Sequence, residues 1–325
     1  MAGLRLTDEI IAKINLPEHS GLNNSEIATL LGITRGTVLK YRKVKTDSEK
    51  TSQAPQNNYA RLPTPDTIAG GPELPTPIEI ECKPYEARDR GFWGVISDIH
   101  IPFHDLPTLK AFVKECKRTA VVGIHLNGDI LDFHGLSDHF KEPNGPKIGE
   151  EIKKGRQLLE YLRGEFPKAR IIYKEGNHDF RLKRYIANRA PELFDLTEVQ
   201  LPSLLGMGNL GIEWVDDKRI VNIGNLPTLH GHEYQGGGGV MPARWLFLRT
   251  AESAMMGHFH HPTAYTFRSL TGKEIGLWST GCACSLQPQY RPYNQWAHAF
   301  AMVDVQNDSH FVVHQRRVLK DGTVV

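Results

Sequence analysis

The sequence of 325 residues has few cysteines, no long apolar run and almost no net charge. Four cysteines are too few for a disulfide framework in a chain of this length, and we expect them to be reduced thiols. No stretch approaches the roughly 18 consecutive apolar residues of a membrane-spanning helix, so we expect no membrane partner. The formal net charge of +2 excludes a global field that would attract nucleic acid, and any basic surface must be local.

The beginning of the sequence also lacks the basic and then apolar segments of a secretory signal peptide. Asp8 and Glu9 stand where such a signal would carry positive charge. Together with the scarcity of cysteine, this predicts a cytoplasmic protein.

Composition divides the chain into three regions. Residues 1–45 have the apolar spacing of helices, whereas residues 46–84 hold seven prolines and many polar side chains, which predicts an extended linker. Residues 85–325 alternate strand-like and helix-like segments. This alternation predicts an α/β domain with a parallel or mixed sheet covered by helices.

The expected elements of the third region follow from apolar spacing. Strand-like runs occupy residues 92–97, 121–126 and 169–173, and helical patterns occupy residues 106–119 and 148–166 between them. Further strands are expected at residues 220–223, 265–268, 275–278, 299–305 and 311–318. The last two should form a hairpin, because Gln306-Asn307-Asp308-Ser309 is rich in turn residues.

Five short groups of potential metal ligands follow apolar segments. They are Asp98-Ile99-His100, Gly128-Asp129-Ile130-Leu131-Asp132, Gly176-Asn177-His178-Asp179, Leu229-His230-Gly231-His232 and Gly257-His258-Phe259-His260. Each group alone is uninformative, because such short motifs occur often by chance. Five groups in this order predict one site, since an open α/β sheet binds ligands beyond the carboxyl ends of its strands. The glycines would allow tight turns and close backbone approach.

In this order the groups resemble the motifs of the calcineurin-like metallophosphoesterase superfamily, over about residues 92–262. The resemblance implies an αββα sandwich, in which two mixed sheets pack face to face with helices outside. It also implies two metal ions at one edge of the sheets. One ion would be held by Asp98, His100 and His260, the other by Asn177, His230 and His258, and both by Asp129.

The implied ligand set indicates which metals would bind. Four imidazoles with carboxylates and an amide favour divalent transition metals over Mg or Ca, which prefer oxygen ligands. We expect Mn, with Fe, Ni, Co or Zn as alternatives. The resemblance implies that a hydroxide bridging the two ions attacks phosphorus, and two ions about 3.5–4 Å apart suit such an attack.

Two residues beside the ligands would assist the reaction. The resemblance places His178 over the substrate as the general acid and Asp132 beside it to orient its ring. Asp132 could instead cap a loop or helix, as Asp commonly does. Phe133 stands where the related protein phosphatases carry an arginine, which argues against protein phosphatase activity. Arg181 or Arg184 on the next helix could bind the substrate phosphate, or simply face solvent.

Residues 25–43 resemble a helix-turn-helix. Gly32 can adopt a left-handed turn and Thr34 can cap the second helix. That helix would present Arg35, Thr37, Lys40 and Lys43 to DNA. The alternative is a helical hairpin that packs or binds protein. A helix-turn-helix joined to a phosphoesterase resembles phage- and prophage-encoded phosphoesterases, which would act in a host cytoplasm.

The leading hypothesis is hydrolysis of phosphodiester bonds in nucleic acid, with DNA bound through residues 1–45. A second hypothesis is a phosphomonoesterase that acts on a nucleotide or a phosphoprotein. A third is a DNA-binding regulator with a vestigial metal site. The complete ligand set and His178 favour an enzyme. The sequence leaves the natural substrate and the oligomeric state open.

Overall fold

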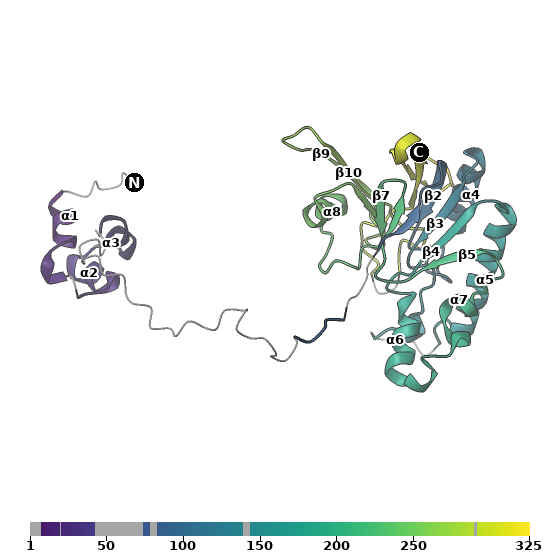
Figure 1. Cartoon of the computed structure of the whole chain (residues 1–325), viewed down its shortest axis with the longest axis horizontal. Helices are drawn as coiled ribbons and strands as arrows, with labels where there is room; N and C mark the ends of the chain where they lie inside the picture. Colours follow the sequence, from purple (N-terminus) through teal and green to yellow (C-terminus); the bar gives the residue numbers. More distant parts are fainter. Residues whose placement is uncertain (1–7, 20, 43–73, 79–82, 139–143, 289–290) are drawn as a thin grey trace. The chain divides into compact units, whose positions relative to one another are not determined.

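The computed structural model describes residues 8–19, 21–42, 74–78, 83–138, 144–288 and 291–325 (Figure 1). Internal contacts divide the chain into two units, Met1–Pro77 and Ile78–Val325. Most of the predicted linker and Lys43 lie outside the described residues. No helix in the described part combines the length and apolar character needed to cross a membrane.

The first unit contains three short α-helices and one 3-10 turn in its described part. These are α1 (Asp8–Ile14), the turn at Pro17–His19, α2 (Asn24–Leu31) and α3 (Arg35–Tyr41). Its core consists of Ile14, Ile27, Ala28 and Val38. The turn between α2 and α3 is formed as the sequence predicted. Gly32 has a φ of 63°, and the Thr34 side chain accepts a hydrogen bond from the Thr37 amide.

The second unit is built on two mixed sheets, each of six strands among the described residues. The first sheet has the order β12-β11-β2-β3-β4-β5. Strands β2 to β5 run parallel, whereas β11 is antiparallel to both β2 and β12. The strands are β2 (Gly91–Ile96), β3 (Gly123–Asn127), β4 (Arg170–Lys174), β5 (Ile212–Val215), β11 (Ala299–Val305) and β12 (Phe311–Arg317).

The second sheet has the order β1-β6-β7-β8-β10-β9. Its strands are β1 (Tyr85–Ala87), β6 (Val221–Ile223), β7 (Leu226–Leu229), β8 (Ala254–Met256), β9 (Thr263–Arg268) and β10 (Glu274–Ser279). The longer helices are α4 (Leu106–Arg118), α5 (Ile148–Glu165), α6 (Phe180–Arg189) and α8 (Pro242–Thr250), with the single turn α7 (Leu201–Leu204).

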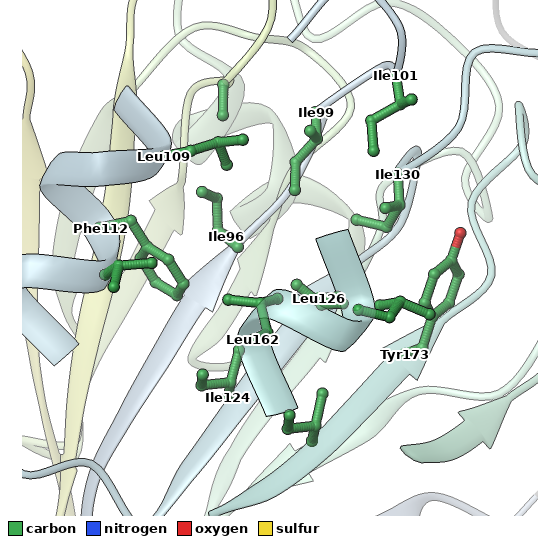
Figure 2. Close-up of a cluster of buried hydrophobic side chains, with 14 of the residues drawn as sticks. Ile96, Ile99, Ile101, Leu109, Phe112, Ile124, Leu126, Ile130, Leu162 and Tyr173 are labelled. Carbon is green, nitrogen blue, oxygen red and sulfur yellow. The ribbon is translucent and has the colours of Figure 1, made fainter. Parts of the chain in front are cut away.

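The two sheets pack face to face, with helices on their outer faces. Strand β2 shows why, because its side chains alternate between two cores. Trp93 and Val95 enter the core between the sheets, whereas Ile96 packs towards α4 and α5 (Figure 2). A third core joins α8 to the outer face of the second sheet through Ala243 and Leu246. Burying each large apolar side chain contributes roughly 1.5–3 kcal/mol. The fold is therefore the αββα sandwich expected from the sequence.

Most of the strands and helices that apolar spacing predicted are present, with one correction. The sequence placed His230 after a strand at residues 220–223. In the structure β6 turns back into β7, and β7 leads to His230. Pro227 lies inside β7, and a proline makes a short run look unlike a strand.

Candidate metal centre

All seven predicted metal ligands lie just beyond the carboxyl ends of strands. Asp98 and His100 follow β2, Asp129 follows β3 and Asn177 follows β4, all in the first sheet. In the second sheet, His230 follows β7, and His258 and His260 follow β8. The candidate site is therefore formed where the two sheets meet.

Five of these residues have left-handed backbone conformations, which side-chain-bearing residues rarely adopt. The φ angles are 55° at Asp98, 49° at His100, 54° at Asp129, 67° at His258 and 58° at His260. Each such residue costs on the order of 1–3 kcal/mol and persists only where its surroundings hold it. A concentration of strained residues in ligand-bearing loops is typical of a functional site.

Two of the motif glycines allow the loops to approach the ligands. A Cβ on Gly176 would lie 2.3 Å from both the amide nitrogen and Oδ1 of Asp129. A Cβ on Gly257 would lie 2.5 Å from Ser97 Oγ and 2.6 Å from Asp98 Oδ2. Any side chain at either position would displace a predicted ligand, so the expected need for glycine is confirmed.

The first predicted ligand group converges on one small volume. His260 Nε2 lies 3.1 Å from Asp98 Oδ1 and 3.2 Å from His100 Nε2. His100 Nε2 lies 3.8 Å from Asp129 Oδ2, the proposed shared carboxylate. One ligand atom from each of Asp98, His100 and Asp129 lies within 4.8 Å of the other two. These atoms could surround a single ion.

The second predicted group also comes together around Asp129. One ligand atom from each of Asp129, His230 and His258 lies within 4.8 Å of the others, and His230 Nε2 is 3.1 Å from Asp129 Oδ2. The Nδ1 of His230 hydrogen-bonds to the Asn127 carbonyl at 2.8 Å, which directs the Nε2 lone pair towards the site. Asn177 Oδ1 is buried and has no hydrogen-bond partner among the described residues. A buried amide oxygen without a hydrogen-bond partner is expected where the partner is a metal ion.

Electrostatics in this centre keep the carboxylates ionised. Burial would raise the pKa of Asp98, but His260 and His230 outweigh it and lower this pKa to about 2. The pKa of Asp129 is held well below its usual value, because His230 and His178 likewise outweigh burial. Burial, followed by the charge of His230, lowers the pKa of His258 to about 3, so its ring is neutral. Burial would lower the pKa of His230 and His260, but Asp129 and Asp98 outweigh it and raise both to about 10. A divalent metal would therefore displace protons from these two rings on binding.

His178 lies at the edge of this centre in contact with Asp132 and Arg181. Its Nδ1 is 3.1 Å from Asp132 Oδ1 and 3.0 Å from the Asp132 carbonyl. The Nη2 atom of Arg181 lies 3.1 Å from His178 Nε2, and the Nη1 atom of Arg181 donates to the Asp132 carbonyl at 2.8 Å. Because a guanidinium can only donate, Nε2 accepts from Arg181 and the ring proton sits on Nδ1 in this arrangement.

Asp132 does more than the sequence predicted. Its Oδ1 also accepts a hydrogen bond from His100 Nδ1 at 2.8 Å, which leaves His100 Nε2 facing the other ligands. Burial would raise the pKa of Asp132, but its hydrogen bonds to His100 and His178 hold it far below the usual range. Asp132 therefore orients one predicted ligand and the predicted general acid together, which the loop-cap alternative does not explain.

The structure distinguishes the two arginines on α6. Arg181 contacts His178, whereas Arg184 pairs with Asp138 at 2.8 Å near the surface. Phe133, which replaces the arginine of protein phosphatases, is fully buried, and its amide donates to Glu151 at 2.6 Å. Phe133 therefore belongs to the core. Of the arginines named from the sequence, Arg181 is the one placed beside the candidate site.

Sequence reasoning missed a buried ion pair behind His230. Lys174, at the end of β4, is fully buried, and its ammonium lies 3.0 Å from Glu233 Oε1. The Glu233 carboxylate accepts the backbone N–H groups of His230 at 3.0 Å and Gly231 at 2.6 Å. Burial would raise the pKa of Glu233, but Lys174 and the nearby histidines lower it to about 2. The sequence signal for this pair was Lys174 itself, a lysine at the end of an apolar strand.

A second missed contact involves Cys284. Its thiol lies 3.7 Å from His260 Nδ1, on the ring atom that does not face Asp98. His100, His260 and Cys284 form one of the groups whose atoms lie close enough to hold an ion. The sequence had favoured a ligand set without cysteine, and the structure places a buried thiol directly behind one predicted ligand.

The predicted DNA contacts in the first unit divide into three cases. Arg35 and Lys40 are exposed on α3. Thr37 is half-buried, and its hydroxyl bonds to that of Thr34 at 2.9 Å, so it serves the helix cap. Lys43 lies outside the described residues. Arg42, the next basic residue, is bound to Asn24 at 2.7 Å within the unit.

The site and the sheets can now be compared with known proteins. No protein-family model matches the chain. The Gene 54 protein of Mycobacterium phage L5 is 28% identical over 240 residues, which cover 65% of this chain and 88% of that protein. The chain therefore has a phage relative.

Similar solved structures include Vacuolar Protein Sorting 29 from Cryptosporidium parvum, with 16% identity and a TM-score of 0.40, covering 73% of this chain and 96% of that one. They also include YfcE, a phosphoesterase from E. coli, with 16% identity and a TM-score of 0.36, covering 72% of this chain and 96% of that one. The order of the five ligand groups resembles that of the calcineurin-like metallophosphoesterases.

Proposed function

We propose that this metallophosphoesterase-like chain is a metal-dependent phosphodiesterase that acts on nucleic acid. One observation carries the proposal. Six of the seven predicted ligands, from loops of both sheets, converge on one centre, and His178 lies beside it with Asp132 and Arg181. A vestigial site would not be expected to keep five strained ligand positions and a buried unpartnered amide.

Two divalent ions, when bound, would supply positive charge to the phosphate ester and to the attacking water. The donor set suits divalent transition metals, and Mn is the ion that we expect, with Fe, Ni, Co or Zn as alternatives. One ion would be held by Asp98, His100 and His260, the second by Asn177, His230 and His258, and both by Asp129.

The protein's own contribution would come from His178 and Arg181. In the structure the Arg181 guanidinium donates to His178 Nε2, so this nitrogen cannot donate a proton. A substrate phosphate would attract Arg181, because charge-assisted hydrogen bonds to phosphate are stronger than one to a neutral ring. Arg181 would then hold the phosphate, and the freed His178 Nε2 could take up a proton from solvent. The doubly protonated ring could then donate this proton to the leaving oxygen. Asp132 would keep Nδ1 protonated and the ring in place.

The phosphomonoesterase hypothesis is the second candidate, and Arg181 favours it too. An arginine beside the centre can grip the extra charge of a dianionic monoester. Action on DNA is supported instead by the helical first unit, which exposes Arg35 and Lys40 on α3.

The test uses purified full-length protein that has been stripped of metal and resupplied with Mn. Hydrolysis should be measured on plasmid DNA, a chromogenic phosphodiester and a chromogenic phosphomonoester. Activity should require the added metal and disappear in excess chelator. Asp129→Asn should weaken both metal positions, whereas Asp138→Asn, a surface acid paired with Arg184, should retain two bound ions.

Three results would contradict parts of the proposal. Full activity in chelator would exclude metal-dependent hydrolysis. Wild-type metal content in Asp129→Asn would exclude a shared carboxylate. Much faster monoester than diester turnover, without DNA binding, would favour the phosphomonoesterase.

A further inference from the structure

A cavity of about 440 Å³ lies between α4 and α5, outside the candidate metal centre. Its walls are aliphatic or aromatic side chains of β2, β3, α4 and α5, several of them labelled in Figure 2: Ile96, Leu109, Phe112, Leu126 and Leu162. Its volume falls in the range of about 300–1,000 Å³ that is typical of small-molecule sites.

The mouth of the cavity is apolar and exposed. Leu106 is 52% exposed and Tyr161 is 48% exposed, and both line the cavity. These exposed side chains continue into the apolar cavity. Together they form an apolar surface that a ligand could shield from water. The interior therefore suits a hydrocarbon tail that enters between the two helices.

The polar groups at the cavity carry one sign of charge. Lys110 on α4 and Lys154 on α5 line it, and neither has a carboxylate within 4.0 Å in the described part of the chain. His104 also lines it, and its buried Nδ1 has no hydrogen-bond partner among those residues. Burial, followed by the nearby Lys154 charge, lowers the pKa of His104. Two ammonium groups without an ion-pair partner in the described part of the chain are complementary to an anionic head group.

We infer that this cavity binds a single-chain amphipathic anion, a medium-chain fatty-acid carboxylate. Its tail lies among the apolar walls, and its carboxylate lies between Lys110, Lys154 and His104. Ile99 and Ile101, which flank the predicted ligand His100, form part of the same walls. The site is independent of the proposed function, because it shares no predicted ligand with the metal centre.

The test measures binding of hexanoate, octanoate and decanoate to the full-length protein by isothermal titration calorimetry, below their micellar concentrations. Affinity should increase roughly fourfold with each added CH₂ until the cavity is full. Decanol, which lacks the charge, should bind more weakly than decanoate. Lys154→Gln should weaken decanoate binding about two- to fivefold and leave decanol binding unchanged.

Lys153→Gln is the matched control, because Lys153 is the exposed neighbour of Lys154 on α5 but does not line the cavity. Leu158→Phe should fill the space and abolish binding. If that variant fails to fold, the comparison of Lys154→Gln with Lys153→Gln still tests whether decanoate binds at this cavity. Absence of saturable binding, equal effects of the two lysine substitutions, or equal affinity for decanol and decanoate would each overturn the inference.

Discussion

His178 differs from the four predicted histidine ligands because a cation, the Arg181 guanidinium, contacts its ring. Both of its nitrogens are occupied by neighbouring side chains, Asp132 on one side and Arg181 on the other. The ligand His230 instead has one nitrogen bonded to a backbone carbonyl and the other left for an ion. The environment therefore separates a residue suited to proton transfer from residues suited to coordination.

This separation predicts the behaviour of His178→Ala. Metal content should remain at two ions, whereas turnover should fall about 10²–10⁴-fold, as expected when a general acid is lost. The loss should shrink for substrates with good leaving groups, which need no proton. The measurement is kcat across a series of aryl phosphodiesters together with metal analysis, with His310→Ala, an exposed histidine, as the control. Loss of metal, or an equal loss across the series, would contradict the role.

Glu151 makes stability depend on pH. It is fully buried beneath Phe133, and burial, followed by the charge of Asp132, raises its pKa to about 8. Because the folded pKa lies above the ordinary value of 4.5, the folded state is favoured at low pH. The stability of the folded state should decline between about pH 4.5, where Glu151 ionises in the unfolded chain, and about pH 8, where it ionises in the folded protein.

Glu151→Gln should remove most of this decline, because glutamine stays neutral and its oxygen can still accept from Phe133. The variant should therefore be more stable than the wild type at pH 9, by on the order of a few kcal/mol. Thermal unfolding of the metal-free protein at pH 5 and pH 9 would measure it. Glu150→Gln, on the exposed neighbouring position, should keep the wild-type dependence. Identical pH dependence in all three proteins would disprove the assignment.

At the scale of elements, the Lys174–Glu233 pair joins the two sheets. Lys174 ends β4 of the first sheet, which leads to Asn177, and Glu233 supports the loop after β7 of the second sheet, which carries His230. Both of those loops supply predicted ligands to the same metal position. The pair should therefore fix the distance between the two ligand loops of the second metal position, and it should affect the first metal position less.

Lys174→Met should leave the Glu233 carboxylate buried without its partner. We expect a loss of about 3–5 kcal/mol in unfolding free energy and a weaker second metal position. The double variant Lys174→Met/Glu233→Gln should recover much of the stability, because the uncompensated charge is gone. Chemical denaturation and metal titration would test this, with the exposed Lys168→Met as control. Strictly additive losses in the double variant would exclude a coupled pair.

The sequence predicted the elements that show a continuous apolar run or a helical spacing. Strands β2 and β11 are such runs, helix α5 has the spacing, and the five ligand loops follow from short polar groups at strand ends. The three residues of β6 were found because Ile220 lengthens their apolar run, whereas β1 contains Glu86 and β8 is only Ala-Met-Met. Contacts such as those of Lys174 and Cys284 join residues far apart in sequence, so only the folded structure brings them together.

At the scale of the whole molecule, the first unit should direct the enzyme to long DNA. Deleting residues 1–45 should slow hydrolysis of plasmid DNA yet leave a small chromogenic diester unaffected, because only the long substrate can be held by both units. The double variant Arg35→Ala/Lys40→Ala should also slow plasmid hydrolysis and spare the small diester. Adding Lys43→Ala should not restore plasmid hydrolysis.

The wild-type advantage on plasmid should fade between about 50 and 200 mM salt, as phosphate contacts are screened. Glu18→Ala, an exposed residue of the same unit, is the control. Gel-shift assays and plasmid cleavage at several salt concentrations would measure both effects. Equal plasmid activity with and without residues 1–45 would show that the unit serves another purpose.

The pairing of β2 with β11 has a consequence for the chain while it is being synthesised. Strand β2 comes early in the sheet-bearing unit, but one of its two neighbours, β11, comes after every predicted ligand. A nascent chain that had passed His260 would already carry the full ligand set, while β2 still exposed an unpaired edge. Such an edge invites pairing with other chains. Completion of synthesis, rather than arrival of the last ligand, is then the step that protects the protein from aggregation.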